Sequence, residues 1–192
     1  MPLSDYIENK PTIETERLTL RTMNKEDAEA LNEWMPDKEI YRYWGKGPGK
    51  TDKKPELLFE KKEMPSKSFH FGIALKNTGK IIGEIWIYLI ENDRMAKLAI
   101  RIGRKYQKNG YAGEAVEAMI GFCFENTELQ RIWADVDVNN MASIRMLERC
   151  GFRKEGTIRQ GKMVSTWCDY HLYAILKSDL DNRDDDEAKG GV

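Results

Sequence analysis

The segment 107–113 holds the residues whose types and spacing could do chemistry: Gln107, Lys108, Asn109, Gly110, Tyr111, Ala112 and Gly113. It lies between a predicted strand and a predicted helix, so its backbone N–H groups and the positive end of that helix could face a pyrophosphate. Gly110 lets the backbone turn tightly, and Ala112 lets a ligand approach closely. A small-residue turn into a helix also occurs without any ligand, so the motif alone leaves both interpretations open.

Hydrophobic periodicity predicts the elements that position this segment. Alternating or β-branched apolar residues predict strands over 17–23, 69–76, 80–90, 98–103, 131–136, 152–159 and 168–176. Helical spacing predicts helices over 24–35, 110–125 and 140–150. A tight turn centred on Asn92 and Asp93 would place Glu84 opposite Arg101. Strand, helix, strand and helix within a mostly antiparallel sheet predict a mixed α/β fold.

The composition is that of a soluble globular protein. The chain has 192 residues, of which 33% are charged and 41% hydrophobic, and its formal net charge is −1. Residues 12–178 are expected to form one domain, between an N-terminal arm (1–11) and an acidic, solvated tail (179–192). The balanced charge gives no reason to expect a nucleic acid as partner, and no apolar run is long enough to span a membrane.

Cysteine and histidine usage indicates neither a disulfide framework nor a metal site. The three cysteines form no Cys-x-x-Cys pair, and the two histidines, His70 and His171, are far apart in the sequence. The first residues lack the basic and then apolar pattern of a signal peptide. We therefore expect a reducing, cytoplasmic location.

Several motifs together resemble one known family. The 107–113 loop is followed by a strand at 131–136 and by a helix that opens at 139–145 and closes in Cys150, Gly151 and Phe152. The runs ETERLTLR at 14–21 and GKIIGEI at 79–85, and the pattern of Trp167, Asp169 and Tyr173, add to the likeness. In this order the motifs resemble the GNAT acyltransferase superfamily, and within it the Rim-type branch that acetylates ribosomal-protein N-termini and related amines.

The resemblance implies a fold and a donor, acetyl-CoA. The fold would be a mostly antiparallel sheet flanked by helices, in which two central strands, 98–102 and 131–136, splay apart to admit the pantetheine arm. The loop 107–113 would hold the pyrophosphate, the backbones of Ile100 and Ile102 would line the gap, and Ile102 N–H would face the acetyl oxygen. Asn140 would hydrogen-bond the pantetheine arm, cap its own helix, or do both.

The mechanism implied is direct attack of a neutral amine on the thioester. Ser143 would donate a hydrogen bond to the leaving sulfur, although a serine in the first turn of a helix often bonds only to nearby backbone. The sequence departs from many relatives at Lys97, where they carry a glutamate, and at Leu147, where they carry a tyrosine acid. An α-amine, with a pKa near 8, has a usable neutral fraction at pH 7, so a weak base would suffice.

The base and the acceptor-binding residues stay open at this point. Glu84, Asp135 and Asp137 are candidate bases, but a cross-strand ion pair with Arg101 is the stronger interpretation of Glu84. Trp86 would lie on the same strand face as Glu84 and could line an aromatic substrate cleft. A cluster that precedes a Gly- and Lys-rich loop could form either a substrate wall or a helix-end core; its members are Tyr41, Tyr43 and Trp44.

Three functions follow from these expectations. The leading one is acetyl transfer to a protein N-terminal α-amine or a small-molecule primary amine, by a monomer or homodimer. A polyamine or antibiotic acetyltransferase of the same fold is the second. The third is a non-catalytic acyl-CoA-binding module, favoured only by Lys97 and Leu147.

Overall fold

A computed structural model describes residues 1–3, 5–43, 68–163 and 166–180. Within them, one sheet of eight strands runs in the order β1-β2-β3-β4-β5-β6-β8-β7. The strands are β1 (Ile13–Glu14), β2 (Leu18–Arg21), β3 (Phe69–Leu75), β4 (Ile81–Glu91), β5 (Met95–Ile102), β6 (Arg131–Asp137), β7 (Arg153–Met163) and β8 (Thr166–Leu176). The helices are α1 (Asp5–Glu8), α2 (Ala28–Trp34), α4 (Tyr111–Asn126) and α5 (Met141–Arg149), with the 3₁₀ turns η1 (Lys25–Asp27), η2 (Lys38–Tyr41) and η3 (Arg104–Tyr106).

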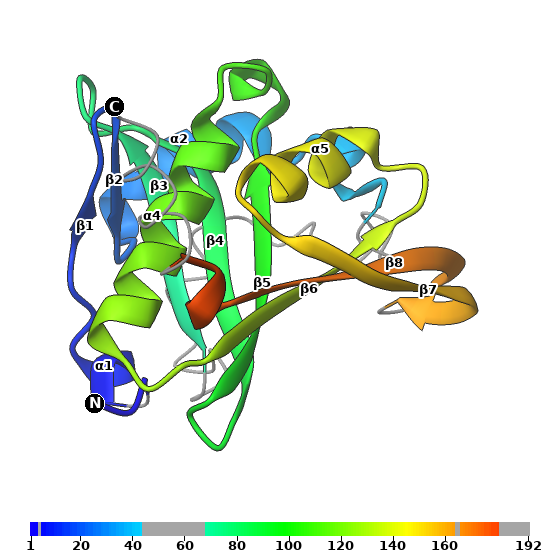
Figure 1. Cartoon of the computed structure of the whole chain (residues 1–192). Coiled ribbons are helices and arrows are strands. Elements are labelled where there is room, and N and C mark those ends of the chain that lie inside the picture. The colour runs from blue at the N-terminus through cyan, green and yellow to red at the C-terminus, as the bar shows by residue number, and fades with distance from the viewer. Residues whose placement is uncertain (4, 44–67, 164–165, 181–192) are drawn as a thin grey trace, which may run out of the picture.

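The central strands β5 and β6 form the only parallel pair of this described sheet, and their pairing is short. It runs from Met95 opposite Arg131 to Lys97 opposite Trp133, although β5 continues to Ile102 and β6 to Asp137. The two strands therefore separate beyond Lys97, as Figure 1 shows. This confirms the splayed central strands that the resemblance to the GNAT superfamily implied.

The antiparallel meander β3-β4-β5 has the predicted turn and register. Asn92 and Asp93 take left-handed backbone angles, with φ of 49° and 53°, which suits a tight hairpin turn. Glu84 pairs directly with Arg101. The prediction that these two side chains face each other is therefore confirmed.

Helices cover both faces of the sheet. Figure 1 shows α4 and α5 on the viewer's side and α2 behind. The apolar face of α4 packs into the main core through residues such as Val116, Met119 and Phe124. A second, smaller core forms behind the sheet around Leu31, Trp34, Met35, Ile40, Tyr41, Ala74 and Ile81. The mixed α/β layers follow from this division of apolar side chains.

The ends of the described chain pack against the domain more than the sequence suggested. Leu3, assigned to the arm, is fully buried in the main core, and the ring of Tyr6 meets Phe122 edge-on at 5.3 Å. Asp179, assigned to the tail, is buried and pairs with Arg153 at 3.0 Å. Residues 181–192 lie outside the described part of the chain.

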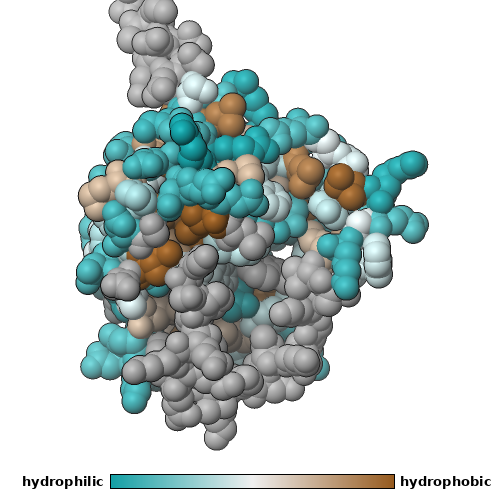
Figure 2. Space-filling view, turned by 90° about the horizontal axis from the view of Figure 1, so that it is seen from below, coloured by the Kyte–Doolittle hydropathy of each residue, from teal (hydrophilic) through white to brown (hydrophobic). Residues whose placement is uncertain are grey.

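Among the described residues, the face of the molecule drawn in Figure 2 is mainly hydrophilic. Seen from below, the apolar residues form small separate patches among polar ones (Figure 2). The described cysteines are all free thiols, and the described residues contain no His, Cys, Asp and Glu cluster suited to a metal ion. Among the described helices, none has the length and apolar character needed to cross a membrane.

Candidate active site

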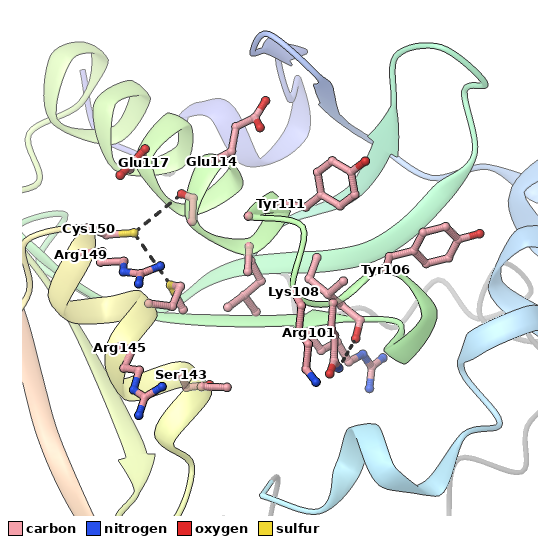
Figure 3. Close-up of a pocket in the computed structure, with 18 of the residues that line it drawn as sticks. Arg101, Tyr106, Lys108, Tyr111, Glu114, Glu117, Ser143, Arg145, Arg149 and Cys150 are labelled. Atoms are coloured by element: carbon pink, nitrogen blue, oxygen red, sulfur yellow. Dashed lines mark hydrogen bonds between the residues drawn. The ribbon is translucent and has the colours of Figure 1, made fainter.

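A cavity of about 1180 Å³ opens where β5 and β6 separate. Its walls come from β5, the 107–113 loop, the first turns of α4, the helix α5 and the η2 region (Figure 3). Most of the predicted donor-site residues line it: Ile100, Ile102, Gln107, Lys108, Gly110, Tyr111, Ala112, Gly113, Asn140 and Ser143. The cavity thus brings together residues that span more than 40 positions of the sequence.

The backbone of β5 presents polar groups to this gap. Gly103 N–H donates to Ile82 O on β4 at 2.9 Å. Because N–H groups alternate in direction along a strand, those of Ile102 and Ile100 point away from β4, toward the side where β6 has moved off. Ile102 O accepts a hydrogen bond from Gln107 Nε2 at 2.9 Å. An extended chain could therefore pair with β5 here as a further strand would.

The 107–113 loop has the backbone of an anion cradle. Gly110 lies in the left-handed region at φ 81° and is the N-cap of α4. Glycine has no side chain to cap the helix, so no side chain from the N-cap bonds the first N–H groups of α4. Lys108 is also left-handed, at φ 65°. Asn109 alone of the predicted donor-site residues does not line the cavity, because its amide Nδ2 donates to Tyr106 O and Gln107 O within the loop.

A salt bridge that the sequence did not reveal holds this loop in place. Arg17 NH2 lies 2.6 Å from Glu114 Oε2, and Arg17 NH1 donates to Asn109 O at 3.0 Å. Glu114 also accepts from Thr15 Oγ1 at 2.5 Å. Burial acts to raise the pKa of Glu114, but the hydrogen bonds from Thr15 and Arg17 outweigh it and lower that pKa. Residues before β2 therefore brace the cradle against the start of α4.

The helix α5 contributes two predicted side chains. Asn140 Oδ1 accepts from Ser143 N at 3.2 Å, which confirms Asn140 as the N-cap of α5. Both residues also line the cavity. In the described part of the chain the Ser143 hydroxyl forms no hydrogen bond, so the alternative of local backbone bonding is not what the structure shows.

Two arginines on α5 are cavity residues that the sequence reasoning missed. Arg145 and Arg149 both line the cavity, and neither has an ionic partner among the described residues (Figure 3). They lie four residues apart, so they share one helical face, and this spacing was the available signal. With Lys108 they make the cavity cationic, which suits a donor that carries phosphates. The open N–H groups of the cradle and these cations fit acetyl-CoA.

Glu84 lies in a buried network on the other face of the sheet. Its Oε1 accepts from Arg101 Nε at 2.9 Å, and its Oε2 lies 2.8 Å from His70 Nε2. Burial acts to raise the pKa of Glu84, but Arg101 and His70 outweigh it and hold that pKa below its ordinary value. Both carboxylate oxygens are engaged, and Glu84 does not line the cavity. This geometry favours the ion-pair interpretation over a general base.

The other candidate bases lie on β6. Asp135 Oδ2 accepts from Lys97 Nζ at 2.7 Å, at the point where β5 and β6 separate. The Lys97 ammonium lies 4.8 Å from the ring centroid of Trp133 and 5.6 Å from that of Tyr88. Asp137 Oδ1 accepts from Asn139 N at 2.8 Å and so shapes the turn before α5. Lys97 is thus the partner of a carboxylate in this structure.

The predicted aromatic substrate wall is only partly present. Tyr43 lines the cavity. Tyr41 is buried in the smaller core and donates its hydroxyl to Met35 O at 2.9 Å, so its assignment to the substrate wall is corrected to the helix-end core. Trp86 stacks on His70 with ring centroids 4.7 Å apart and does not line the cavity. Trp44 lies outside the described residues.

Comparison with known proteins assigns the class. Residues 17–153 match the family model described as an acetyltransferase (GNAT) domain. The chain belongs to this family of acetyl-CoA-dependent N-acetyltransferases. It is 30% identical to p20 of Bacillus licheniformis, an uncharacterised N-acetyltransferase, over 86% of this chain and 96% of that one. A solved GNAT acetyltransferase from Bacillus anthracis has a TM-score of 0.77 at 28% identity, over 88% of this chain and 99% of that one.

The relatives carry the names of different acceptors. The chain is 26% identical to the spermidine N(1)-acetyltransferase of Vibrio cholerae, over 87% of this chain and 97% of that one. It shares a fold, with a TM-score of 0.73 at 23% identity, with a ribosomal-protein-S5-alanine acetyltransferase from Vibrio fischeri, over 88% of this chain and 98% of that one. The family therefore defines the donor and the transfer, and the acceptor has to be argued from this chain's own residues.

Proposed function

We propose that this acetyltransferase acetylates a primary amine, either the α-amine of a protein N-terminus or the amine of a small molecule, by direct attack within a ternary complex. The observation that carries the proposal is the opening between β5 and β6 beyond Lys97 and Trp133, which leads into the cavity beside the 107–113 loop. An opening between the strands gives donor and acceptor a common meeting point at the end of β5. Holding both reactants there supplies the proximity that amine attack needs.

The residues around this opening have separate tasks in the proposal. Acetyl-CoA supplies the activated acetyl thioester. Ile102 N–H points into the gap and would donate to the acetyl oxygen, where negative charge develops. The Asn140 amide would hold the pantetheine arm, and the Ser143 hydroxyl would donate to the departing sulfur. Each of these groups binds or orients, so none has to transfer a proton outright.

Proton removal from the amine requires only a weak base. An α-amine has a pKa near 8 and a usable neutral fraction at pH 7, whereas a lysine amine near 10.4 has almost none. Asp135 and Asp137 are the candidate acceptors of that proton, through water, because neither lines the cavity and each keeps one carboxylate oxygen that Lys97 or Asn139 does not bind. Glu84 is the weaker candidate, since His70 and Arg101 occupy its oxygens.

A polyamine is the second candidate acceptor. It is favoured by the likeness to the spermidine acetyltransferase, which extends over nearly that whole protein. Asp135 is already paired with Lys97, so Asp137, on the same face of β6, is the carboxylate that could attract a cationic acceptor. The two candidates differ in charge, so a panel of acceptors separates them.

The test begins with a thermal shift of the whole chain on addition of acetyl-CoA, with Gly110→Gln as the variant expected to lose the shift. Thiol release is then measured with α-amine peptides, amino acids, spermidine, aminoglycosides and simple alkylamines. Turnover with one class of amine would support the proposal and name its acceptor. A thermal shift without turnover on any acceptor would instead favour an acyl-CoA-binding module. The absence of a thermal shift with acetyl-CoA would exclude the proposed donor site.

A further inference from the structure

We propose that Arg101 selects the acceptor, by donating hydrogen bonds to an oxygen that lies beside the reacting amine, and that Glu84 and His70 are the positioning residues that hold it. This inference rests on the proposed acetyl transfer to an amine. The acceptor class it favours is an amine next to a carbonyl or carboxylate group, as in a peptide N-terminus or a free amino acid.

The first observation is the place of Arg101 in the fold. It lies on β5 between Ile100 and Ile102, whose N–H groups point into the gap, and its own side chain lines the cavity (Figure 3). Neighbouring side chains on a strand leave from opposite faces, so Arg101 lies on the face that carries Glu84, away from the main core. An amine that attacks near Ile102 would therefore pass close to this guanidinium.

The second observation is that the guanidinium is fixed before any acceptor arrives. Glu84 Oε1 accepts from Arg101 Nε at 2.9 Å and from NH2 at 2.5 Å. The guanidinium carbon lies 5.2 Å from the ring centroids of Tyr41 and Trp86 and 5.7 Å from that of Trp34. Three rings and an ion pair restrict its rotamers, so little entropy is lost when it forms further hydrogen bonds.

The third observation is the support behind the ion pair. His70 Nε2 lies 2.8 Å from Glu84 Oε2, and the imidazole stacks on Trp86 with an interplanar angle of 10°. Glu84 is 2% exposed and His70 is 7% exposed, and neither lines the cavity. Burying such a pair costs desolvation energy that apolar packing would avoid, so stability alone does not explain it.

The arrangement turns the positive end of the pair toward the cavity. Arg101 lines the wall while its carboxylate partner lies behind it. A guanidinium presents planar, parallel N–H groups that match a carbonyl or carboxylate oxygen. A polyamine offers only positive charge to such a wall, whereas an α-amino group carries its own oxygen close to the amine nitrogen. The wall therefore favours the second kind of acceptor.

The test compares acceptors that differ in that oxygen. The kcat/KM values of the wild type and of its variants are measured with an N-terminal peptide, a free amino acid, n-butylamine and spermidine. The double variant Glu84→Gln/Arg101→Gln removes both partners, which avoids leaving a buried carboxylate unpaired. Each substrate is compared with itself across variants, so differences in amine pKa cancel. Arg131→Gln is the matched control, because it breaks another Arg–Glu pair, with Glu155, outside the cavity.

We expect the double variant to lose about 10- to 100-fold in kcat/KM with the peptide or the amino acid, and to stay within about twofold with n-butylamine. If the peptide loses more in kcat/KM than the amino acid, the oxygen that Arg101 binds is a peptide carbonyl oxygen. If the amino acid loses more, it is a carboxylate oxygen. Equal losses with all amines would show a structural role and overturn the inference. Arg101→Lys keeps the charge without the planar fork, and it decides the question in the same way if the double variant fails to fold.

The failure of this inference differs from the failure of the proposed function. If the wild type acetylates spermidine or n-butylamine at least as well as the peptide and the amino acid, the role of Arg101 is wrong and amine acetylation stands. If the wild type acetylates no amine, both proposals are wrong. Arg131→Gln should match the wild type with every acceptor, and a specificity change there would also overturn the assignment to Arg101.

Discussion

Substituting Gly110 tests the 107–113 loop in two ways, through the stability of its turn and through acetyl-CoA binding. The backbone at Gly110 is strained for any other residue. At φ 81° an L-residue is disfavoured by roughly 1–2 kcal/mol. A Cβ atom added there would lie 3.3 Å from Arg17 NH2, and the Glu114 carboxylate limits how far that guanidinium can move. We therefore expect Gly110→Ala to lower the free energy of unfolding by about 1–2 kcal/mol.

Gly121 provides the matched control within the same helix. It lies inside α4, does not line the cavity, and a Cβ added there would first meet Glu125 Oε1 at 4.0 Å. Gly121→Ala should raise the free energy of unfolding by about 0.5–1 kcal/mol, because alanine loses less backbone entropy in a helix. Urea titrations followed by tryptophan fluorescence would measure both changes. Equal effects of the two substitutions would refute the reasoning from the backbone angle.

The same position tests the donor site. A long side chain at residue 110 would project into the cradle, so Gly110→Gln should weaken acetyl-CoA binding at least about tenfold, which corresponds to about 1.4 kcal/mol. Gly121→Ala should leave the dissociation constant unchanged. Isothermal titration calorimetry with acetyl-CoA measures both. An unchanged affinity in Gly110→Gln would exclude the 107–113 loop as the pyrophosphate site.

Three further predictions concern the Ser143 hydroxyl, the pair of Lys97 and Asp135, and the Glu84 carboxylate. Ser143→Ala should lower kcat by about two- to tenfold and leave acetyl-CoA affinity unchanged, as comparison of turnover with calorimetry would show; unchanged kcat would remove its role at the sulfur. Lys97→Met and Asp135→Asn should each lower the free energy of unfolding by about 1–3 kcal/mol. Their double variant should lower it by at least about 1 kcal/mol less than the sum of the two single effects. Additive effects in urea titrations would exclude a coupled pair. Burial acts to raise the pKa of Glu84, but Arg101 and His70 outweigh it and lower that pKa in the folded state. The ionised carboxylate therefore stabilises the fold above about pH 4.3, which is the pKa of an unfolded glutamate. This stabilisation is lost as the pH falls through the lower pKa of the folded state. Urea titrations of the wild type and Glu84→Gln should therefore converge as the pH falls below about 4, and a difference that grows toward acid would contradict the lowered pKa.

Local patterns predicted most of the sheet and the glycine turn at 107–113. Alternation along β4 and β5, together with the turn at Asn92 and Asp93, is sufficient to place Glu84 opposite Arg101. The N-cap at Asn140 likewise depends on a residue only three positions away, and the start of α4 depends on the conformation of Gly110 itself. These features depend on local backbone preferences, which a sequence displays directly.

Contacts between distant segments could not be read in this way. The brace between Arg17 and Glu114 joins residues 97 positions apart, and neither residue has a local pattern that names its partner. The orientation of Tyr41 also depends on packing, since an aromatic residue at a helix end suits a core and a substrate wall equally. Contacts of this kind are determined only by the tertiary structure.

The position of His70 behind the pair of Glu84 and Arg101 depends on a one-residue shift in the pairing of β3 with β4. Near their turn, β3 and β4 pair Ala74 with Ile81, and that register, if continued, would place His70 opposite Ile85, on the face away from Glu84. The extra residue Ile82 shifts the pairing, so His70 lies opposite Trp86 instead. Opposed residues share a face, and this bulge therefore brings the imidazole to the Glu84 carboxylate. The support for Arg101 thus arises from an irregularity that periodicity alone does not predict.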